Sequence, residues 1–162
     1  MDTDRARALL AASPVARLAT AAADGTPHLV PVTFAVSGDQ VVIAIDHKPK
    51  TTHNLRRLRN IRDNPRVSLL ADHYEADWTR LWWARADGTA RILDGSKREP
   101  ALTLLAERYE QYAEHRPQGP VIDITVTRWS GWSSTPAEDI PAGANLDRAG
   151  RAAERRGQGR ND

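Results

Sequence analysis

The sequence predicts a mainly β fold of the α+β class, in which about six strands form a closed or split antiparallel barrel with helices packed outside it. Three observations lead to this prediction. Short runs rich in β-branched and aromatic residues recur along the chain. Tight-turn sequences such as Asp24-Gly25 separate several of them, and two segments have the spacing of helices that cross between strands.

The first part of the chain predicts a short helix followed by a three-stranded meander. Residues 4–12 form the helix, and Pro14 ends it. The predicted strands are residues 15–23, 28–36 and 41–45. Pro31 cannot donate a hydrogen bond to a neighbouring strand, so the second strand should lie at a sheet edge or carry a bulge.

The middle and end of the chain supply two longer helices and further strands. Thr51 or Thr52 is expected to cap the first helix, which Asn64-Pro65 ends. The second helix is predicted at residues 98–112. The further predicted strands are residues 67–73, 80–93 and 121–133. Segment 80–93 is either one long strand or a hairpin bent at Asp87-Gly88.

Composition predicts one globular domain and a tail. Residues 1–136 form the domain, whereas residues 137–162 are rich in Ala, Gly and Arg and predict a flexible tail. Residues 147–162 hold five arginines and three acids, an excess equal to the net charge of +2 for the whole chain. The positive charge is therefore poor support for nucleic-acid binding, and no nucleic-acid partner is expected.

Other features favour a cytoplasmic protein. The chain has no apolar run of about 18 residues, so no membrane span or membrane partner is predicted. Its first residues lack the apolar segment of a signal peptide. It contains no cysteine, which excludes disulfides and thiol chemistry.

A basic turn between the strand at 41–45 and the following helix is the first candidate binding site. Its polar side chains are Lys48, Lys50, Thr51 and Thr52. Helix N-termini carry unpaired N–H groups and partial positive charge, so this turn predicts a phosphate site. The alternative is an ordinary solvated turn before a capped helix. The glycines of a Walker loop are absent.

The tryptophans form the second candidate site. They are Trp78, Trp82, Trp83, Trp129 and Trp132. Because Trp82 and Trp83 are adjacent in a strand, they should point to opposite faces, and one of them should be exposed, at an interface or against a ligand. Indoles offer stacking surfaces for a flat isoalloxazine or deazaflavin ring. The alternative is that they are core and dimer-interface residues.

Other kinds of catalytic site find little support. The His and Asp residues at 46, 47, 72, 73 and 77 do not have the spacing of a zinc or iron site, so no metal is expected. The sequence has no G-x-S-x-G motif and no evident pair of catalytic carboxylates. A cofactor that carries the chemistry is therefore the simpler enzyme hypothesis.

Four motifs occur in an order that resembles a known family. They are ARLAT with a later PVTF, DHKPKTTHNLRRLRNIRDNPRV, LLADHYEADWTRLWW and ITVTRWSGW. Over residues 5–135 the chain resembles the pyridoxamine 5′-phosphate oxidase-like split β-barrel flavoproteins. More narrowly, it resembles their F420-dependent branch, the flavin/deazaflavin oxidoreductase B group.

The resemblance implies a six- to seven-stranded split barrel of the FMN-binding type, and a homodimer with two cofactor sites at its interface. The ring system would contact Pro31, Val32, Thr33 and Phe34 with Ile45. The cofactor phosphate would lie at Lys48, Lys50, Thr51 and Thr52, with Asn54 near the helix start. The partner subunit would contribute aromatic side chains from among Trp78, Trp82, Trp83, Trp129 and Trp132. Extra basic residues for the F420 tail would be Arg56, Arg57 and Arg80.

The implied reaction is hydride transfer between F420, an 8-hydroxy-5-deazaflavin, and a small conjugated substrate. The catalytic residues stay unassigned, and the proton donor is His73, Tyr74 or solvent. Two alternatives keep the fold. One is an FMN-dependent oxidase or flavin reductase, and the other is a flavin- or haem-binding module without turnover.

Overall fold

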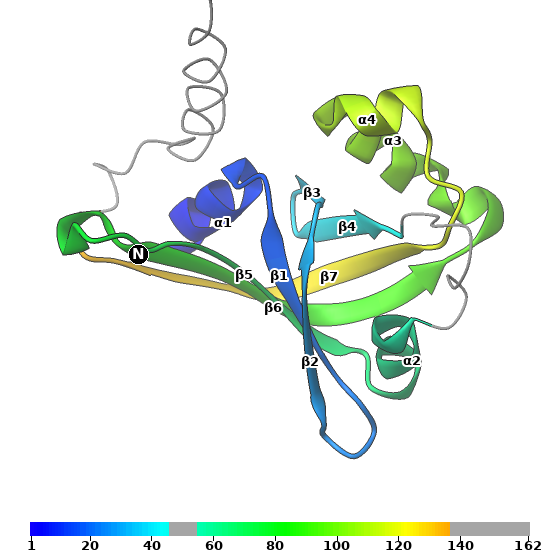
Figure 1. Cartoon of the computed structure of the whole chain (residues 1–162), viewed down its shortest axis with the longest axis horizontal. Helices are drawn as coiled ribbons and strands as arrows, with labels where there is room; N and C mark the ends of the chain where they lie inside the picture. Colours follow the sequence, from blue (N-terminus) through cyan, green and yellow to red (C-terminus); the bar gives the residue numbers. More distant parts are fainter. Residues whose placement is uncertain (46–54, 137–162) are drawn as a thin grey trace, which may run out of the picture.

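The computed structural model describes residues 1–45 and 55–136 (Figure 1). The predicted tail at 137–162 lies outside the described residues. The elements, in chain order, are α1 (Thr3–Ala12), β1 (Ala16–Ala21), β2 (Pro27–Val32), β3 (Ala35–Ser37), β4 (Gln40–Ala44), α2 (Arg56–Asp63), β5 (Arg66–His73), η2 (Trp78–Arg80), β6 (Trp82–Leu93), η3 (Gly95–Arg98), α3 (Glu99–Arg108), α4 (Glu110–Glu114) and β7 (Val121–Ser133).

The strands form one antiparallel seven-stranded sheet in the order β2-β1-β5-β6-β7-β4-β3. This open sheet with flanking helices confirms the predicted fold class and corresponds to the split form of the barrel. Strand β2 lies at one edge, as Pro31 predicted. No helix among the described residues is long and apolar enough to cross a membrane.

Segment 80–93 is one long strand, β6, and not a hairpin. It pairs with β5 on one side and with β7 on the other. Its register with β7 shifts between Asp87 and Gly88, where Thr127 is the additional residue of a bulge. The Thr127 hydroxyl donates to the Asp87 carbonyl at 3.2 Å. The bulge gives the two longest strands their bend.

Three local predictions were wrong. The predicted strand at 28–36 is two strands, because the backbone of Phe34 bonds to the Tyr109 hydroxyl and not to a neighbouring strand. The predicted helix at 98–112 is interrupted at Tyr109, which has an extended backbone with φ −124° and ψ 116°. Helix α2 begins later than predicted, at Arg56 with Leu55 as its N-cap and no side-chain cap, and the expected caps Thr51 and Thr52 lie outside the described residues.

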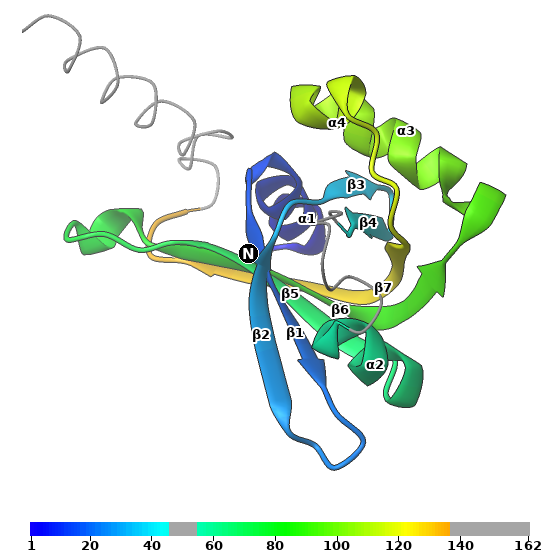
Figure 2. The same ribbon diagram turned by 45° about the vertical axis from the view of Figure 1, so that its right-hand side comes forward.

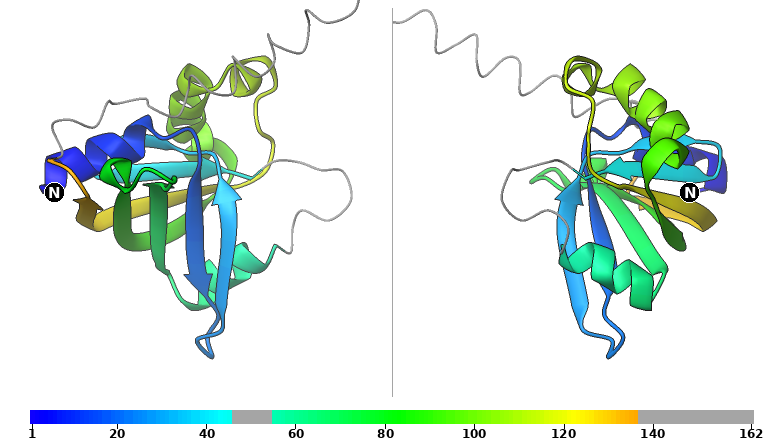
Figure 3. Two further views of the ribbon diagram at one scale, coloured as in Figure 1. Left: turned by 60° about the vertical axis from the view of Figure 1, so that its left-hand side comes forward. Right: turned by 90° about the vertical axis from the view of Figure 1, so that its right-hand side faces the viewer.

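The main core lies between one face of the sheet and helices α1 and α2. Helix α1 buries Leu9 and Leu10 there, and α2 buries Leu58 and Ile61. A second, smaller core lies where α3 and α4 cover β3 and β4. Figures 2 and 3 show these two helices beyond β3 and β4, away from α2.

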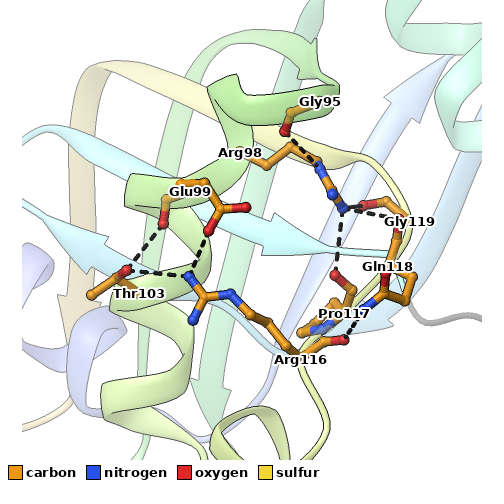
Figure 4. Close-up of polar contacts among 8 residues, drawn as sticks. All are labelled: Gly95, Arg98, Glu99, Thr103, Arg116, Pro117, Gln118 and Gly119. Atoms are coloured by element: carbon orange, nitrogen blue, oxygen red, sulfur yellow. Dashed lines mark hydrogen bonds and ion pairs between the residues drawn. The ribbon is translucent and has the colours of Figure 1, made fainter.

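A group of Arg98 hydrogen bonds holds the linker between α4 and β7 (Figure 4). Its guanidinium donates to the carbonyls of Gln118 at 2.9 Å and Gly119 at 2.6 Å, and to Gly95 at 3.1 Å. The linker then meets the end of β4, where the Ile45 N–H donates to the Pro120 carbonyl at 3.1 Å. Arg98 therefore helps to fix the position of Ile45, which directly follows β4.

Helix α2 is fixed to the β1–β2 hairpin by buried polar contacts. The Asn60 amide donates to the Thr20 hydroxyl at 2.9 Å, and both residues are buried. His28 lies opposite Thr20 in the strand pairing. Desolvation by burial, and then repulsion from Arg56 and Arg57, lower the pKa of His28 below its usual 6.5.

We expect Gly88→Ala to destabilise the fold. An added Cβ would collide with the Thr125 carbonyl oxygen and come within 3.0 Å of the Val126 Cα, so β7 would have to move. The expected loss in unfolding free energy is roughly 1–3 kcal/mol by urea denaturation. Thr89→Ala, at the exposed next position, is the control and should stay within about 0.5 kcal/mol. A Gly88→Ala protein of unchanged stability would contradict this account of the bulge.

His28 should make stability fall at mildly acidic pH. Its pKa is lowered in the folded state, so the unfolded chain binds the proton more readily. Protonation then favours unfolding, and stability is lost as pH falls through the unfolded pKa towards the folded one. Between about pH 7.5 and about pH 5.5, the wild type should lose more unfolding free energy than His28→Gln. His115→Gln, at an exposed position, is the control and should follow the wild type. Equal losses in wild type and His28→Gln would contradict the prediction.

Candidate functional site

The candidate site lies on the sheet surface that points away from the main core, which we name the open face. The strand pairing aligns its side chains in rows across β2, β1, β5, β6 and β7. The rows are Leu29–Ala19–Ser68–Asp87–Arg128, Pro31–Arg17–Leu70–Arg85–Ser130 and Asp72–Trp83–Trp132. Alternate residues of these strands, such as Leu18, Leu69 and Ala84, are buried in the main core.

Of the residues predicted to contact a ring system, some lie in the main core and others keep accessible surface. Pro31 lies on the open face, opposite Arg17. Val32, Phe34 and Ile45 are buried in the main core. Thr33 is partly buried, and its hydroxyl lies 2.9 Å from that of Tyr112. Pro31 and Thr33 are therefore the members of this set that retain accessible surface on the single chain.

Trp83 and Trp132 lie opposite each other on β6 and β7, on the open face. Trp132 is 44% exposed, and the Arg85 guanidinium lies 5.8 Å from the centre of the Trp83 ring. Trp82 is buried in the main core, which confirms that it and Trp83 point to opposite faces. Strand pairing therefore places these two indoles next to each other on the same sheet face.

The other two tryptophans have different surroundings. Trp129 is buried in the main core, and its indole N–H donates to the Asp39 carboxylate at 2.8 Å. Trp78 is 77% exposed in η2. Figures 1 and 2 show η2 at the end of a projecting arm made by β5, β6 and the end of β7. Next to it, hydrogen bonds from Thr79 lower the pKa of Asp77.

The predicted phosphate residues lie outside the described residues. They are Lys48, Lys50, Thr51, Thr52 and Asn54. The described residues on either side are Ile45 at the end of β4 and Leu55 before α2. Of the predicted basic residues for an F420 tail, Arg56 and Arg57 begin α2, whereas Arg80 lies in the arm and pairs with Glu75 at 3.1 Å.

A cavity of about 360 Å³ opens beside the predicted ring strand. It lies between the α1–β1 linker and the end of β5, and its lining residues are Ser13, Pro14, Val15, Arg17, Asp72, His73 and Tyr74. Arg17 and Asp72 form an ion pair at 3.0 Å across it. In the strand pairing Arg17 faces Pro31, and Asp72 faces Trp83. Pro31 and Trp83 are thus the strand neighbours of two lining residues and do not line the cavity themselves.

Both candidate proton donors line this cavity. Tyr74 is 64% exposed. His73 is mostly buried, with Nε2 3.4 Å from a Glu75 carboxylate oxygen. The other oxygen of Glu75 pairs with Arg80. A histidine close to a carboxylate is a suitable candidate for a side chain that moves a proton. Among residues 1–45 and 55–136, no three His, Asp or Glu residues gather as a metal site would require.

Sequence reasoning missed Tyr109 and Tyr112. Their hydroxyls reach Phe34 and Thr33, which are 75 and 79 residues away in the chain. Both tyrosines fall within the helix predicted at residues 98–112, and helical spacing does not identify a hydrogen-bond partner in a distant strand.

Comparison with known proteins identifies the family and agrees with the fold. A family model described as pyridoxamine 5′-phosphate oxidase matches residues 2–133. No curated protein gives a sequence match. Among solved structures, a conserved hypothetical protein of Mycobacterium tuberculosis is 22% identical with a TM-score of 0.65, and the match covers 87% of this chain and 89% of the other.

Two further structures have the same fold. A FAD-binding protein of Mesorhizobium loti is 23% identical with a TM-score of 0.58, over 81% of this chain and 94% of the other. The heme storage protein HutZ of Vibrio cholerae is 16% identical with a TM-score of 0.61, over 82% and 95%. The seven-stranded open sheet and the match over residues 2–133 together show that the chain belongs to the pyridoxamine 5′-phosphate oxidase family.

Proposed function

We propose that this protein is an F420-dependent oxidoreductase that transfers a hydride between the deazaflavin and a small conjugated organic substrate. The observation that carries the proposal is the cavity lined by Arg17, Asp72, His73 and Tyr74, in which Arg17 pairs across the sheet with Pro31 and Asp72 with Trp83. Its volume of about 360 Å³ suits a small molecule. The sequence motifs favour the F420-dependent branch of the family, and the cysteine-free chain favours action in the cytoplasm.

The described side chains fit a flat ring with a substrate beside it. Pro31 and the indole of Trp83 present apolar surface on the same sheet face, one on each side of the Arg17–Asp72 pair. The phosphate of the cofactor is assigned to Lys48, Lys50 and the threonines that follow. When bound, the deazaflavin supplies the hydride at C5.

The chain's own residues have three tasks in this proposal. Arg17 and Asp72 orient a polar group of the substrate, since each keeps hydrogen-bonding capacity beyond their single 3.0 Å contact. His73, whose Nε2 lies 3.4 Å from Glu75, moves the proton that accompanies the hydride. The indoles of Trp83 and Trp132 exclude water from the reacting atoms.

The active form in this proposal is a homodimer joined through the open face. Leu29 is 65% exposed and Trp132 is 44% exposed on it, so this face offers apolar surface that a partner could cover. The same face carries both charge signs, as in Arg17 with Asp72 and Arg85 with Asp87. A second copy brings the same apolar and charged groups, so a twofold contact can pair them.

A non-catalytic binding protein is the second candidate. The solved structures of similar fold include a heme storage protein as well as a FAD-binding protein. An FMN-dependent oxidase or flavin reductase is the third, because FMN and F420 both carry a phosphate on the ribityl chain. These candidates differ in the ligand that binds and in whether a hydride is transferred.

Titration of the purified protein with F420, FMN and haem should separate these candidates. We expect saturable micromolar binding of F420, weaker binding of FMN, and no Soret band shift with haem. F420 turnover with quinone and enone acceptors should follow. Tight binding of FMN alone would favour the oxidase or flavin reductase. Haem binding without flavin binding would favour the storage protein.

Lys48→Ala combined with Lys50→Ala should raise the dissociation constant of F420 about tenfold or more, because two charge-assisted contacts to phosphate are lost. Lys97, the remaining lysine of the chain, lies in η3, so Lys97→Ala is the matched control and should bind like the wild type. An unchanged dissociation constant in the double variant, with a normal melting temperature, would overturn the phosphate assignment.

Leu29→Glu should convert the dimer into a monomer, since two carboxylates would be buried close together at a twofold contact. Light scattering after size exclusion gives the mass. F420 affinity should fall in parallel if both subunits complete each site. Ala8→Glu, at an exposed position of α1, adds the same charge and should stay dimeric. A monomeric wild type, or a dimeric Leu29→Glu protein, would refute this interface.

A further inference from the structure

The junction between β2 and β3 is held by side chains. Phe34 N–H donates to the Tyr109 hydroxyl at 3.1 Å, and the Phe34 carbonyl lies 2.9 Å from the same hydroxyl. The Arg108 Nε–H also donates to it at 3.1 Å, and the Pro14 carbonyl lies 3.1 Å away. The hydroxyl has one proton to donate and two lone pairs, so these neighbours use its whole capacity. Tyr109 therefore has a structural role.

Tyr112 reaches the neighbouring residue, Thr33. The two hydroxyl oxygens are 2.9 Å apart. The Tyr112 side chain is 9% exposed, and its ring packs edge-on against that of Tyr109 with centroids 5.6 Å apart. It also belongs to the second core, together with Leu102 and Leu105. Its phenol is therefore held in one place by packing on several sides.

Thr33 is the partly buried residue of the junction, and the family resemblance implies that it contacts the ring of the cofactor. A threonine hydroxyl can rotate its proton and adopt alternative rotamers, so a fixed partner decides which direction it presents. Hydrogen bonds that orient a ligand-binding side chain support affinity without contacting the ligand themselves.

We propose that Tyr112 is a positioning residue for the cofactor: it fixes the Thr33 hydroxyl in the orientation that meets the flavin or deazaflavin ring. This inference rests on the proposed function, because it requires that Thr33 contacts the ring. It assigns a role in the site to α4, which lies on the second core and not on the open face.

The test is a double-mutant cycle with Tyr112→Phe and Thr33→Val, measured on the full chain with F420 and with FMN. Tyr112→Phe keeps the buried ring and removes only the hydroxyl. Each single variant should raise the dissociation constant about three- to tenfold for the cofactor that the wild type binds and change its absorption spectrum. The double variant should bind no more weakly than Thr33→Val alone, since Tyr112 acts through Thr33.

Tyr109→Phe separates positioning from stability. It removes more hydrogen bonds than Tyr112→Phe, so it should lower the melting temperature more. If Tyr112 positions the cofactor contact, Tyr112→Phe should nevertheless change the spectrum of the bound cofactor more than Tyr109→Phe does. Loss of affinity that simply follows loss of stability would overturn the inference.

The outcomes also distinguish the two proposals. A wild type that binds neither F420 nor FMN would refute the proposed function and this inference with it. A wild type that binds, combined with additive effects in the cycle or an unchanged Tyr112→Phe protein, would refute only the role of Tyr112.

Discussion

The strand register along β6 is the constraint on which the rest of the structure depends. This strand pairs with β5 and β7 on its two sides, and alternate residues face the main core and the open face. Because the side-chain period is two, a slip of one residue would bury Trp83 and expose Trp82. Small residues at Ala84 and Ala86 leave room in the core for α1 and the large side chains of neighbouring strands.

The same register composes the candidate site. It places Trp83 beside Asp72 and Trp132. In the next row of side chains across the sheet, Arg17 of β1 lies beside Pro31 of β2. Residues from five strands thus share one surface without a loop to bring them together. In the proposed oxidoreductase, rigid strands hold the ring contacts and the substrate cavity, which suits hydride transfer because its rate depends on the distance between reacting atoms.

Local patterns in the sequence predicted much of this fold. Strand β7 has the predicted bounds, residues 121–133, because alternation there is regular, and Pro31 correctly indicated a sheet edge. Prediction failed where a distant partner replaces a local one. The junction at Phe34 and the interruption at Tyr109 arise from the same pair of residues, and each looks regular when its own segment is considered alone.

The site was predictable only in part, for a related reason. Alternation along the strand predicted that Trp82 and Trp83 point to opposite sheet faces. It did not show which of them lies opposite Trp132 on the neighbouring strand. Val32 and Phe34 belong to the predicted ring strand, yet they fill the core. The cavity at Arg17 and Asp72 depends on the β1–β5 pairing, which brings together residues 55 positions apart. The pattern of apolar residues in one sequence does not show which strands pair with each other.

The two prolines of β2 have a consequence for how copies of this protein can meet. Pro27, Leu29 and Pro31 have the same parity on an edge strand, and a proline in that position has its nitrogen on the side away from the neighbouring strand. Of three outward backbone positions, two therefore lack an amide proton. An incoming strand would find a single donor at Leu29, so lengthening of the sheet into a continuous ribbon, the route to fibrous aggregates, is blocked at this end. The dimer proposed above uses a sheet face instead of this edge, and a twofold contact of that kind is closed.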